Sequence, residues 1–367
     1  MSRYDVIVLG GGIIGCALAE ELARRGQRVA VVERGRIGAE ASSAAAGILS
    51  AQMDLPRPGA LFELCQAARR MYPRWVAHLE QQAKCPVGYH RDGLLALAMT
   101  SREALGFERQ ARWQRARGLR VERWSPREIR RHEPAVDGRV RCGFSFPLEA
   151  QVDNVRLMEA LVITCRNTGV RLLEGAAVQR ILITRGTVRG VETDRGRLVA
   201  AAIVNCLGSW ANLDGQFPIK LPVVPVRGQM LAFQAPKGLV RRAIMSSGAY
   251  VVQRRGGWLI AGSTLERAGF EKTLTVEGMQ RILCGVRRFS RALDRCRFMD
   301  AWAGFRPCTP DQLPILGMTS INRMYVATGH YRHGILLAPI TATLMAELML
   351  DGRTSLDLSP FAAHRFC

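Results

Sequence analysis

A glycine turn near the start of the chain has the spacing of a dinucleotide phosphate site. It is Gly10-Gly-Gly-Ile-Ile-Gly15, and Glu33 follows after a further apolar segment. Gly10 permits the tight turn, Gly12 lets the backbone approach a pyrophosphate, and Gly15 lets a helix pack closely. Glu33 is placed to accept hydrogen bonds from ribose hydroxyls. We therefore predict a dinucleotide site, in preference to a glycine-rich turn without a ligand.

Four other segments favour a flavin as that dinucleotide. Nicotinamide enzymes often need a catalytic His, Lys or Tyr beside the cofactor, whereas a flavin carries its own hydride acceptor and asks the protein for orientation and electrostatics. Small residues after Glu33 would let the backbone pass close to a pyrophosphate, a ribityl chain and a ring. The segments are Ser-Ser-Ala-Ala-Ala-Gly-Ile-Leu at 42–49, Gly-Ala-Tyr-Val-Val-Gln-Arg at 248–254, Trp-Ala-Gly-Phe-Arg-Pro-Cys-Thr-Pro-Asp at 302–311 and Gly-His-Tyr-Arg-His-Gly-Ile-Leu-Leu-Ala-Pro at 329–339.

The cysteines and histidines do not form a metal-binding pattern. The chain has 10 Cys and 6 His, without a C-x-x-C motif or a Cys/His cluster at zinc spacing. His330 and His333 are spaced like a metal pair but have no further ligand nearby. We expect no metal, and reduced, mostly buried cysteines in a cytoplasmic protein.

The glycine turn requires a strand on either side of a helix. Residues 4–9 are a β-branched run suited to a buried strand, 16–25 predict a helix, and 28–32 predict a second strand that ends at Glu33. Two later apolar strands, 198–206 and 324–327, also deliver a glycine at the carboxyl end, where ligands bind in open α/β sheets.

A second group of strands predicts a second domain. They alternate more between polar and apolar residues, as in an antiparallel sheet with one exposed face. We predict an α/β fold: a Rossmann-like dinucleotide domain from residues 1–84, 150–215 and 300–367, and an α+β substrate domain from residues 85–149 and 216–299. The expected strands are 93–99, 140–146, 231–234, 250–254 and 258–263, and the expected helices are 60–83, 102–117, 125–131, 154–168, 275–289 and a buried C-terminal helix at 335–350.

Composition excludes a disordered or disulfide-stapled miniature protein. The 367 residues are 48% apolar and carry a formal net charge of +21, which raises the prospect of a polyanion partner. The basic residues are dispersed, and the densest stretch, 109–131, predicts a helical hairpin of mixed charge without interleaved aromatics, so we expect no nucleic-acid partner. Glycines interrupt the apolar run 6–19, and 335–350 is shorter than the roughly 20 residues of a membrane span, so we expect neither a signal peptide nor a membrane partner.

Across essentially its full length, the sequence resembles the glycine oxidase and D-amino-acid oxidase family, closest to the bacterial glycine oxidases of thiamine biosynthesis. The glycine fingerprint is common to many flavoproteins. The segments Ser43-Ala-Ala-Ala-Gly47, Trp302-Ala-Gly-Phe-Arg306-Pro and 329–339 are together much more specific. The resemblance implies an FAD-dependent oxidoreductase that acts on CH–NH2 donors with dioxygen as acceptor.

The resemblance also assigns roles to particular residues. Arg306 matches the arginine that binds the substrate carboxylate, Tyr250 the tyrosine whose hydroxyl supports it, and Arg332 a residue whose backbone carbonyl accepts from the substrate amine. Ile48 and Leu265 stand in the substrate pocket. The positions expected to bind FAD, noncovalently, are Gly10, Gly12, Ile13, Ile14, Gly15, Glu33, Arg34, Ala41, Ser42, Ala46, Gly47, Ile48, Val178, His330, Tyr331, Arg332, His333, Gly334, Ile335 and Leu336.

The mechanism implied is hydride transfer from the substrate Cα to flavin N5. Arg306 and Tyr250 fix the carboxylate, the neutral amine donates its lone pair, and the imine formed hydrolyses to a 2-oxo acid and ammonia, with hydrogen peroxide from dioxygen. The helix that begins after Gly334 would stabilise negative charge at the flavin N1–C2=O edge. Cys308 does not match the flavin-attachment cysteine of the related sarcosine oxidases.

Two departures leave the substrate open. Ile48 and Leu265 stand where glycine oxidases commonly have methionine, which changes the pocket's shape and leaves glycine, sarcosine and D-alanine as candidates. A D-amino-acid dehydrogenase with another electron acceptor, an RNA-acting FAD amine oxidase and an inactive FAD-binding scaffold are the alternatives, the last disfavoured by the presence of Arg306 and Tyr250. The oligomeric state is left open, with a homo-oligomer as one candidate.

Overall fold

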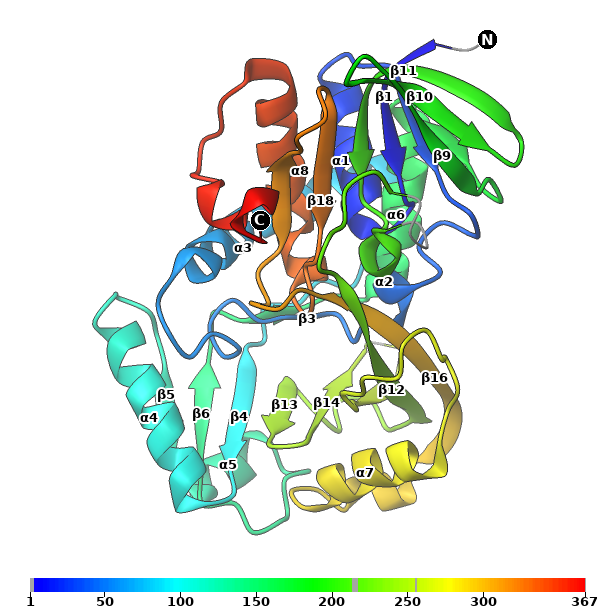
Figure 1. Ribbon diagram of the computed structural model, residues 1–367. Coiled ribbons are helices and arrows are strands. Elements are labelled where there is room, and N and C mark those ends of the chain that lie inside the picture. The colour runs from blue at the N-terminus through cyan, green and yellow to red at the C-terminus, as the bar shows by residue number, and fades with distance from the viewer. Residues whose placement is uncertain (1–2, 213–216, 255, 367) are drawn as a thin grey trace.

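The computed structural model describes residues 3–212, 217–254 and 256–366. In this part of the chain two large sheets form the framework, and a short two-stranded sheet lies between them (Figure 1). The first sheet and its helices occupy the upper half of the view in Figure 1, and the second sheet and its helices the lower half.

The first sheet is mostly parallel. β1 pairs in parallel with both β2 and β11, and β11 pairs in parallel with β18. β17 joins β18 antiparallel, and β9 and β10 form an antiparallel extension of β11. The strand order is β17 (Ile315–Met318), β18 (Met324–Thr328), β11 (Gly196–Asn205), β1 (Arg3–Leu9), β2 (Val29–Val32) and β8 (Arg171–Leu173), with β10 (Thr187–Thr193) and β9 (Val178–Thr184) off this path.

Helices cover the first sheet because its central strands are apolar on both faces. All four residues of β2 are buried, as are the last four of β1. The helices around it are α1 (Ile13–Arg24), α3 (Ala60–Ala83), α6 (Asn154–Asn167) and α8 (Gly334–Asp351), and α1 packs against both α6 and α8. The predicted α/β architecture with a glycine turn between β1 and α1 is therefore present.

The second sheet is antiparallel except where β13 pairs in parallel with β4. α7 (Val276–Arg287) packs against β12, β14 and β15, and α4 (Ser101–Arg115) against β4 and β6. The order is β16 (Arg297–Cys308), β12 (Val224–Gln234), β15 (Trp258–Gly262), β14 (Ala249–Gln253), β13 (Ala243–Ser246), β4 (Leu94–Ala98), β6 (Cys142–Phe146) and β5 (Glu122–Trp124).

The helices expected at 102–117 and 125–131 are present as α4 and α5 (Pro126–His132), but the chain between them is not a simple hairpin turn. α4 ends at Arg115, and the edge strand β5 pairs with β6 before α5 begins. Capping fixes both helix starts: Thr100 with Glu103 and Ser125 with Glu128 form capping boxes. The strand between the two helices was not expected; Trp124, which is buried, ends it, and it pairs with β6.

The return from the second sheet to the first also differs from the expected boundary at residue 300. β16 continues to Cys308 because it pairs with β12 along the whole length of both strands. The Trp302 to Arg306 motif therefore belongs to the second sheet, and the chain rejoins the first sheet at β17. The small sheet of β3 (Ile48–Leu49) and β7 (Ala150–Gln151) lies at the junction.

Helix α8 is the one helix of the described residues that is long and apolar enough to cross a membrane, with a mean hydropathy of 1.5 over 18 residues. In the structure 61% of that window is buried, and the helix packs against α1 and α3. A core helix has this same composition, as the sequence interpretation expected.

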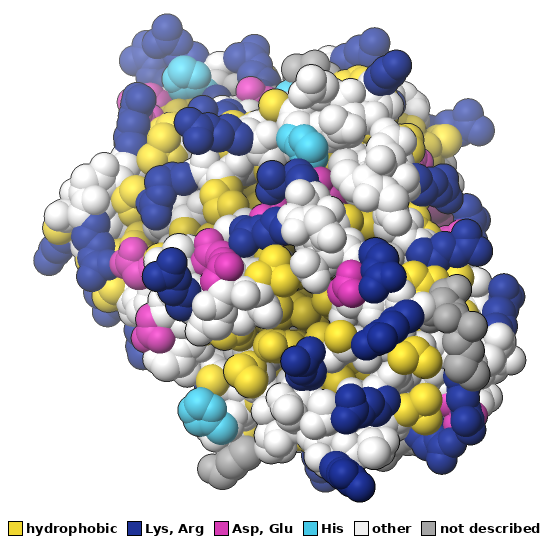
Figure 2. Space-filling model, turned by 90° about the horizontal axis from the view of Figure 1, so that it is seen from above, with side chains coloured by type: hydrophobic (Ala, Val, Ile, Leu, Met, Phe, Trp, Pro, Cys, Tyr) yellow, Lys and Arg dark blue, Asp and Glu magenta, His cyan; other side chains and the backbone are white. Residues whose placement is uncertain are grey.

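Basic side chains are spread over the surface. In Figure 2, Lys and Arg side chains are scattered over the visible face, with acidic side chains between some of them, and they do not gather in one stripe. Several are held in ion pairs, such as Arg28 with Asp5 and Arg365 with Asp311.

Candidate active site

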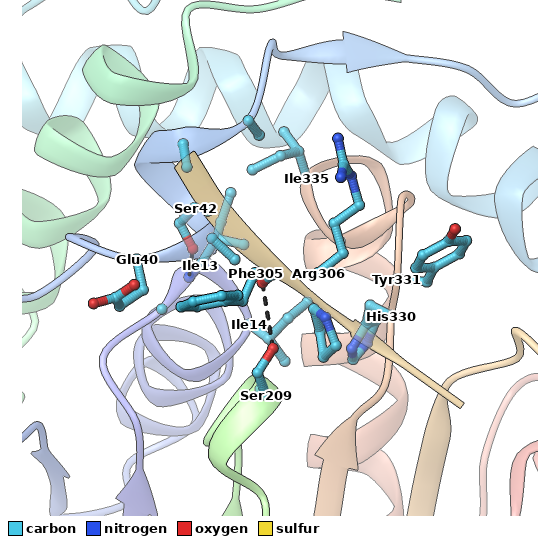
Figure 3. Close-up of a pocket in the computed structure, with 18 of the residues that line it drawn as sticks. Ile13, Ile14, Glu40, Ser42, Ser209, Phe305, Arg306, His330, Tyr331 and Ile335 are labelled. Carbon is cyan, nitrogen blue, oxygen red and sulfur yellow. Dashed lines mark hydrogen bonds between the residues drawn. The ribbon is translucent and has the colours of Figure 1, made fainter. Parts of the chain in front are cut away.

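One large cavity, of about 550 Å³, runs between the first and second sheets. Its lining begins at the Gly10 turn of the first sheet and ends at Arg306 and Tyr250 of the second. Figure 3 shows part of it: Ser42 and Ile13 lie toward the left of the view, Phe305 and Ile14 near the middle, and His330 and Tyr331 toward the right. The two halves of the site thus come from different sheets.

The glycine turn between β1 and α1 is tightly packed. A Cβ at Gly15 would lie 2.0 Å from the carbonyl oxygen of Gly10, so only glycine lets α1 start this close to β1. Gly12 is the N-cap residue of α1 and offers no side chain to the free N–H groups. Ser42 supplies one acceptor from another element, since its Oγ accepts from the N–H of Ile13 at 2.9 Å.

Glu33 lies at the end of β2 and its carboxylate closes the turn. Oε2 accepts from the N–H of Gly11 at 2.8 Å, and Oε1 accepts from the N–H of Gly35 at 2.9 Å. Each carboxylate oxygen keeps acceptor capacity toward the cavity. A contact with ribose hydroxyls stays a prediction.

The small-residue segment forms the short helix α2 (Ala41–Ala44) and then β3. The indole Nε1 of Trp302 on β16 donates to the carbonyl oxygen of Ala44 at 3.0 Å. A Cβ at Gly304 would lie 2.4 Å from the Cβ of Ala44. The Trp-Ala-Gly part of the motif therefore packs β16 of the second sheet directly against α2, which lines the cavity beside the glycine turn.

The 329–336 segment turns sharply before α8. Tyr331 has a φ of +47°, and its N–H donates to the carbonyl oxygen of Pro307 at 3.0 Å, which brings the turn beside Arg306. His330 is buried against Thr341, with Nε2 and Oγ1 3.1 Å apart, and burial lowers its pKa to about 3. Burial also lowers the pKa of His333, so both rings are neutral at physiological pH.

Arg306 enters the cavity from β16. Its Nη2 donates to Ser263 Oγ at 2.7 Å and its Nη1 to the carbonyl oxygen of Thr264 at 3.3 Å. Among the described residues, no carboxylate lies within ion-pair distance of it. A Cβ at Gly228 on the neighbouring strand would lie 2.0 Å from Nη1. The guanidinium is thus packed in place, with its charge left for an anion.

Tyr250 reaches the same region from β14. Its hydroxyl donates to the sulfur of Met230 at 3.2 Å. Burial raises the pKa of Tyr250 and the charge of Arg306 opposes this, so the hydroxyl stays protonated and able to donate a hydrogen bond. Arg306 and Tyr250 are therefore two donors in one cavity.

Arg332 lies at the same end of the cavity. Its Nη1 is 3.8 Å from Oδ1 of Asp54, and its guanidinium lies over the Tyr331 ring, 5.4 Å from the centroid. Leu265 lines the cavity with 57% of its surface exposed, which places it at the rim, and Ile48 lines it from β3.

Most of the residues expected from the sequence line this cavity. Gly15, His333 and Leu336 are not among its described lining residues: Gly15 packs under the turn, and His333 and Leu336 are buried behind the wall. Sequence reasoning missed a set of lining residues that lack a motif of their own. They include Asp54, Trp210, Met230, Met245 and Ser263.

The residues present fit FAD. The N-termini of α1 and α8 both face the cavity, and neither N-cap side chain accepts from the free N–H groups, which suits a pyrophosphate at one end and the flavin carbonyl edge at the other. A Cβ at Gly47 would lie 1.9 Å from the carbonyl oxygen of Val152, so backbone forms the wall there. Cys308 is not among the described lining residues, and its Sγ donates to the carbonyl oxygen of Thr309 at 3.3 Å.

Comparison with known proteins defines the class. Residues 5–348 match the model of the family described as FAD dependent oxidoreductase (DAO), and the chain belongs to this family. Its cofactor is FAD. This confirms the fold and the cofactor expected from the sequence.

Within the family, the chain is similar to glycine oxidases. It is 33% identical to the glycine oxidase of Geobacillus kaustophilus, over 99% of this chain and 97% of that protein. The crystal structure of glycine oxidase from Geobacillus kaustophilus matches with a TM-score of 0.95 over 99% of both chains. The chain is also 37% identical to the bifunctional protein ThiO/ThiG of Synechocystis sp., of which it spans 54% of the length.

Proposed function

We propose that this chain catalyses the FAD-dependent oxidative deamination of glycine or another small amino acid or amine, such as sarcosine or D-alanine. The observation that carries the proposal is the position of Arg306 and Tyr250. They lie in the same cavity as the cofactor turn, and the described partners of Arg306 are all neutral. A cation without a counter-ion, next to a protonated hydroxyl, suits a carboxylate ligand.

The chain's own residues then orient the substrate. Arg306 offers two N–H groups in a plane to the carboxylate, and Tyr250 adds a third donor. The packing of Gly228 against the guanidinium keeps that plane fixed, so binding energy goes into orientation. Bound FAD supplies the two-electron acceptor for the Cα hydride, and dioxygen then takes the electrons to give hydrogen peroxide.

The turn before α8 handles the amine side and the cofactor. The backbone carbonyl of Arg332 is the proposed acceptor from the substrate amine. The free N–H groups at the start of α8 place positive potential at the wall of the cavity, where negative charge develops during the reaction. Neutral His330 and His333 add no competing charge.

We also propose that the imine product feeds thiamine thiazole synthesis, which the similarity to proteins named ThiO/ThiG supports. We also propose a cytoplasmic location and noncovalent FAD. All nine described cysteines are free, which agrees with a reducing compartment.

Peroxide release tests the proposal. The purified yellow holoenzyme is given glycine, sarcosine, D-alanine and D-proline in air, beside an Arg306→Ala variant whose flavin content is measured first. We expect peroxide with at least one small amino acid and its loss in the variant. Flavin bleaching without peroxide would instead indicate a dehydrogenase with another acceptor, and no reduction by any of the four would contradict the proposal.

A further inference from the structure

Three of the described residues that line the cavity are acidic, and two of them are already engaged. Glu33 accepts from the backbone of Gly11 and Gly35, and Glu40 is paired with Lys272 at 2.8 Å. The third, Asp54, accepts no hydrogen bond through its carboxylate from any described residue. Its nearest charged partner, Arg332, is 3.8 Å away, at the limit of an ion pair.

The loop that carries Asp54 is firmly held. The buried carboxylate of Glu149 accepts from three consecutive backbone N–H groups, those of Ala51 at 2.7 Å, Gln52 at 2.6 Å and Met53 at 3.0 Å. From α4, the Nε2 of Gln110 donates to the carbonyl oxygens of Gln52 and Met53, both at 2.8 Å. Asp54 is therefore presented to the cavity by a backbone that Glu149 and helix α4 fix.

Asp54 acts electrostatically on the substrate end of the cavity. Its negative charge contributes to raising the pKa of Tyr250 and opposes the lowering of the pKa of His333. The side chain of Asp54 is 17% exposed, so water screens it only in part. This end of the cavity thus holds two cations, Arg306 and Arg332, and one fixed anion.

That charge arrangement matches a zwitterion. Arg306 attracts the carboxylate of a small ligand, and Asp54 offers a negative charge to the ammonium group at the ligand's other end. A carboxylate in an enclosed site rejects anions and favours cations by more than it would in water.

We propose that Asp54 is a specificity-determining residue that selects ligands carrying a protonated amine over carboxylates of the same shape that lack one. The proposal rests on the proposed carboxylate role of Arg306. It concerns recognition of the amine by a side chain, in addition to the backbone carbonyl of Arg332. The ligand class it defines is the small α-amino acid bound in zwitterionic form, whose ammonium group gives up one proton to solvent before the neutral amine takes part in hydride transfer.

An isosteric ligand pair tests this without turnover. 2-Aminoisobutyrate has no hydrogen on Cα and so cannot be oxidised by hydride loss, and pivalate has a methyl group in place of its ammonium group. Dissociation constants of both are measured on the oxidised holoenzyme from the change in flavin absorption, and checked by the shift in Tm. The variants are Asp54→Asn, which keeps the shape and removes the charge, and Asp54→Glu, which keeps the charge.

We expect the preference for aminoisobutyrate over pivalate to fall by about tenfold in D54N, the scale of one partly screened charge contact. Pivalate should bind D54N more tightly than wild type, because Arg332 loses its counter-ion. D54E should still prefer aminoisobutyrate over pivalate, as the wild type does. The inference would be overturned if wild type and D54N showed the same preference. It would also be overturned if the wild type bound neither ligand.

The outcome is separable from that of the proposed reaction. If wild type discriminates and D54N does not, but no amino acid yields peroxide or bleaches the flavin, Asp54 selects ammonium ligands and the proposed reaction is wrong. If peroxide forms and the preference is the same in both proteins, the reaction stands and Asp54 does not determine specificity.

Discussion

Arg306 and Tyr250 divide carboxylate recognition between a permanent charge and a neutral donor. Burial raises the pKa of Tyr250, which keeps its proton on the hydroxyl throughout the neutral range. We expect Tyr250→Phe to lower kcat/KM about tenfold, since one hydrogen bond to a charged group contributes roughly 1.5 kcal/mol. Steady-state kinetics of the flavin-loaded variant measures this, and an unchanged kcat/KM would remove Tyr250 from the site.

His330 makes the folded state sensitive to acid. Burial lowers its folded pKa to about 3, whereas an unfolded histidine titrates near 6.5. Between these values the unfolded chain binds more protons at this residue, so the contribution of His330 to the free energy of unfolding falls as the pH drops below about 6.5, by up to about 1.4 kcal/mol per pH unit.

The test compares Tm from pH 7 to pH 4.5 in wild type, His330→Asn and the exposed-site control His364→Asn. The Tm curves of wild type and H364N should run parallel, and on going to low pH the Tm of H330N should rise relative to both. Parallel curves for all three would show that His330 is not the group responsible.

At the scale of elements, the pairing of β12 with β16 holds the guanidinium. A Cβ at Gly228 would lie 2.0 Å from Arg306 Nη1, so Gly228→Ala should displace the guanidinium while the sheet and the flavin site persist. We expect kcat/KM to fall by about a hundredfold or more, the scale of a misplaced positioning group.

Gly106→Ala is the matched control, because a Cβ there meets open space on α4. It should leave kinetics unchanged and raise stability slightly. Wild-type kinetics in G228A with bound flavin would show that the packing around Arg306 is not what positions it.

The elements with a strong local pattern could be predicted from the sequence. The helix expected at 60–83 is α3 with the same bounds, and the strand, glycine turn and helix at the start of the chain are present. α1 begins at Ile13, earlier than the expected residue 16, because Gly12 already serves as its N-cap. Strands β8 to β10 were not predicted, since they are partly exposed and gain their stability from pairing along the edge of the first sheet.

The site was predictable where a motif carried it. Arg306 and Tyr250 were singled out by their segments, yet their meeting depends on the strand order β16, β12, β15, β14, which no local pattern encodes. Asp54 lies beyond the end of the Ala-Ala-Ala-Gly segment and has no motif. It becomes noticeable only when Glu149, far along the chain, is seen to hold its loop.

At the scale of the whole molecule, Glu149 ties the loop before Asp54 to the turn between β6 and β7. Burial raises its pKa to about 7, and three backbone donors depend on its carboxylate. Glu149→Ala leaves these donors without an acceptor, at a cost of about 3 kcal/mol, and should lower the Tm of the holoenzyme by roughly 5 °C.

Glu277→Ala is the control for this change. Glu277 is an exposed residue of α7 that is ion-paired with Arg281, and such surface pairs contribute little. The Tm of the Glu277→Ala variant should stay within about 1 °C of the wild-type Tm. An equally small effect of E149A would mean that the loop is held by the α4 glutamines alone.

The central claim is that this cavity brings a small amino acid to bound FAD through Arg306. The most direct measurement is the anaerobic bleaching of the flavin by glycine, sarcosine and D-alanine in wild type and R306A. Our account predicts rapid, saturable bleaching by at least one of them in wild type, and none at the same concentrations in the flavin-loaded variant. Equal bleaching in both proteins, or none in wild type, would contradict it.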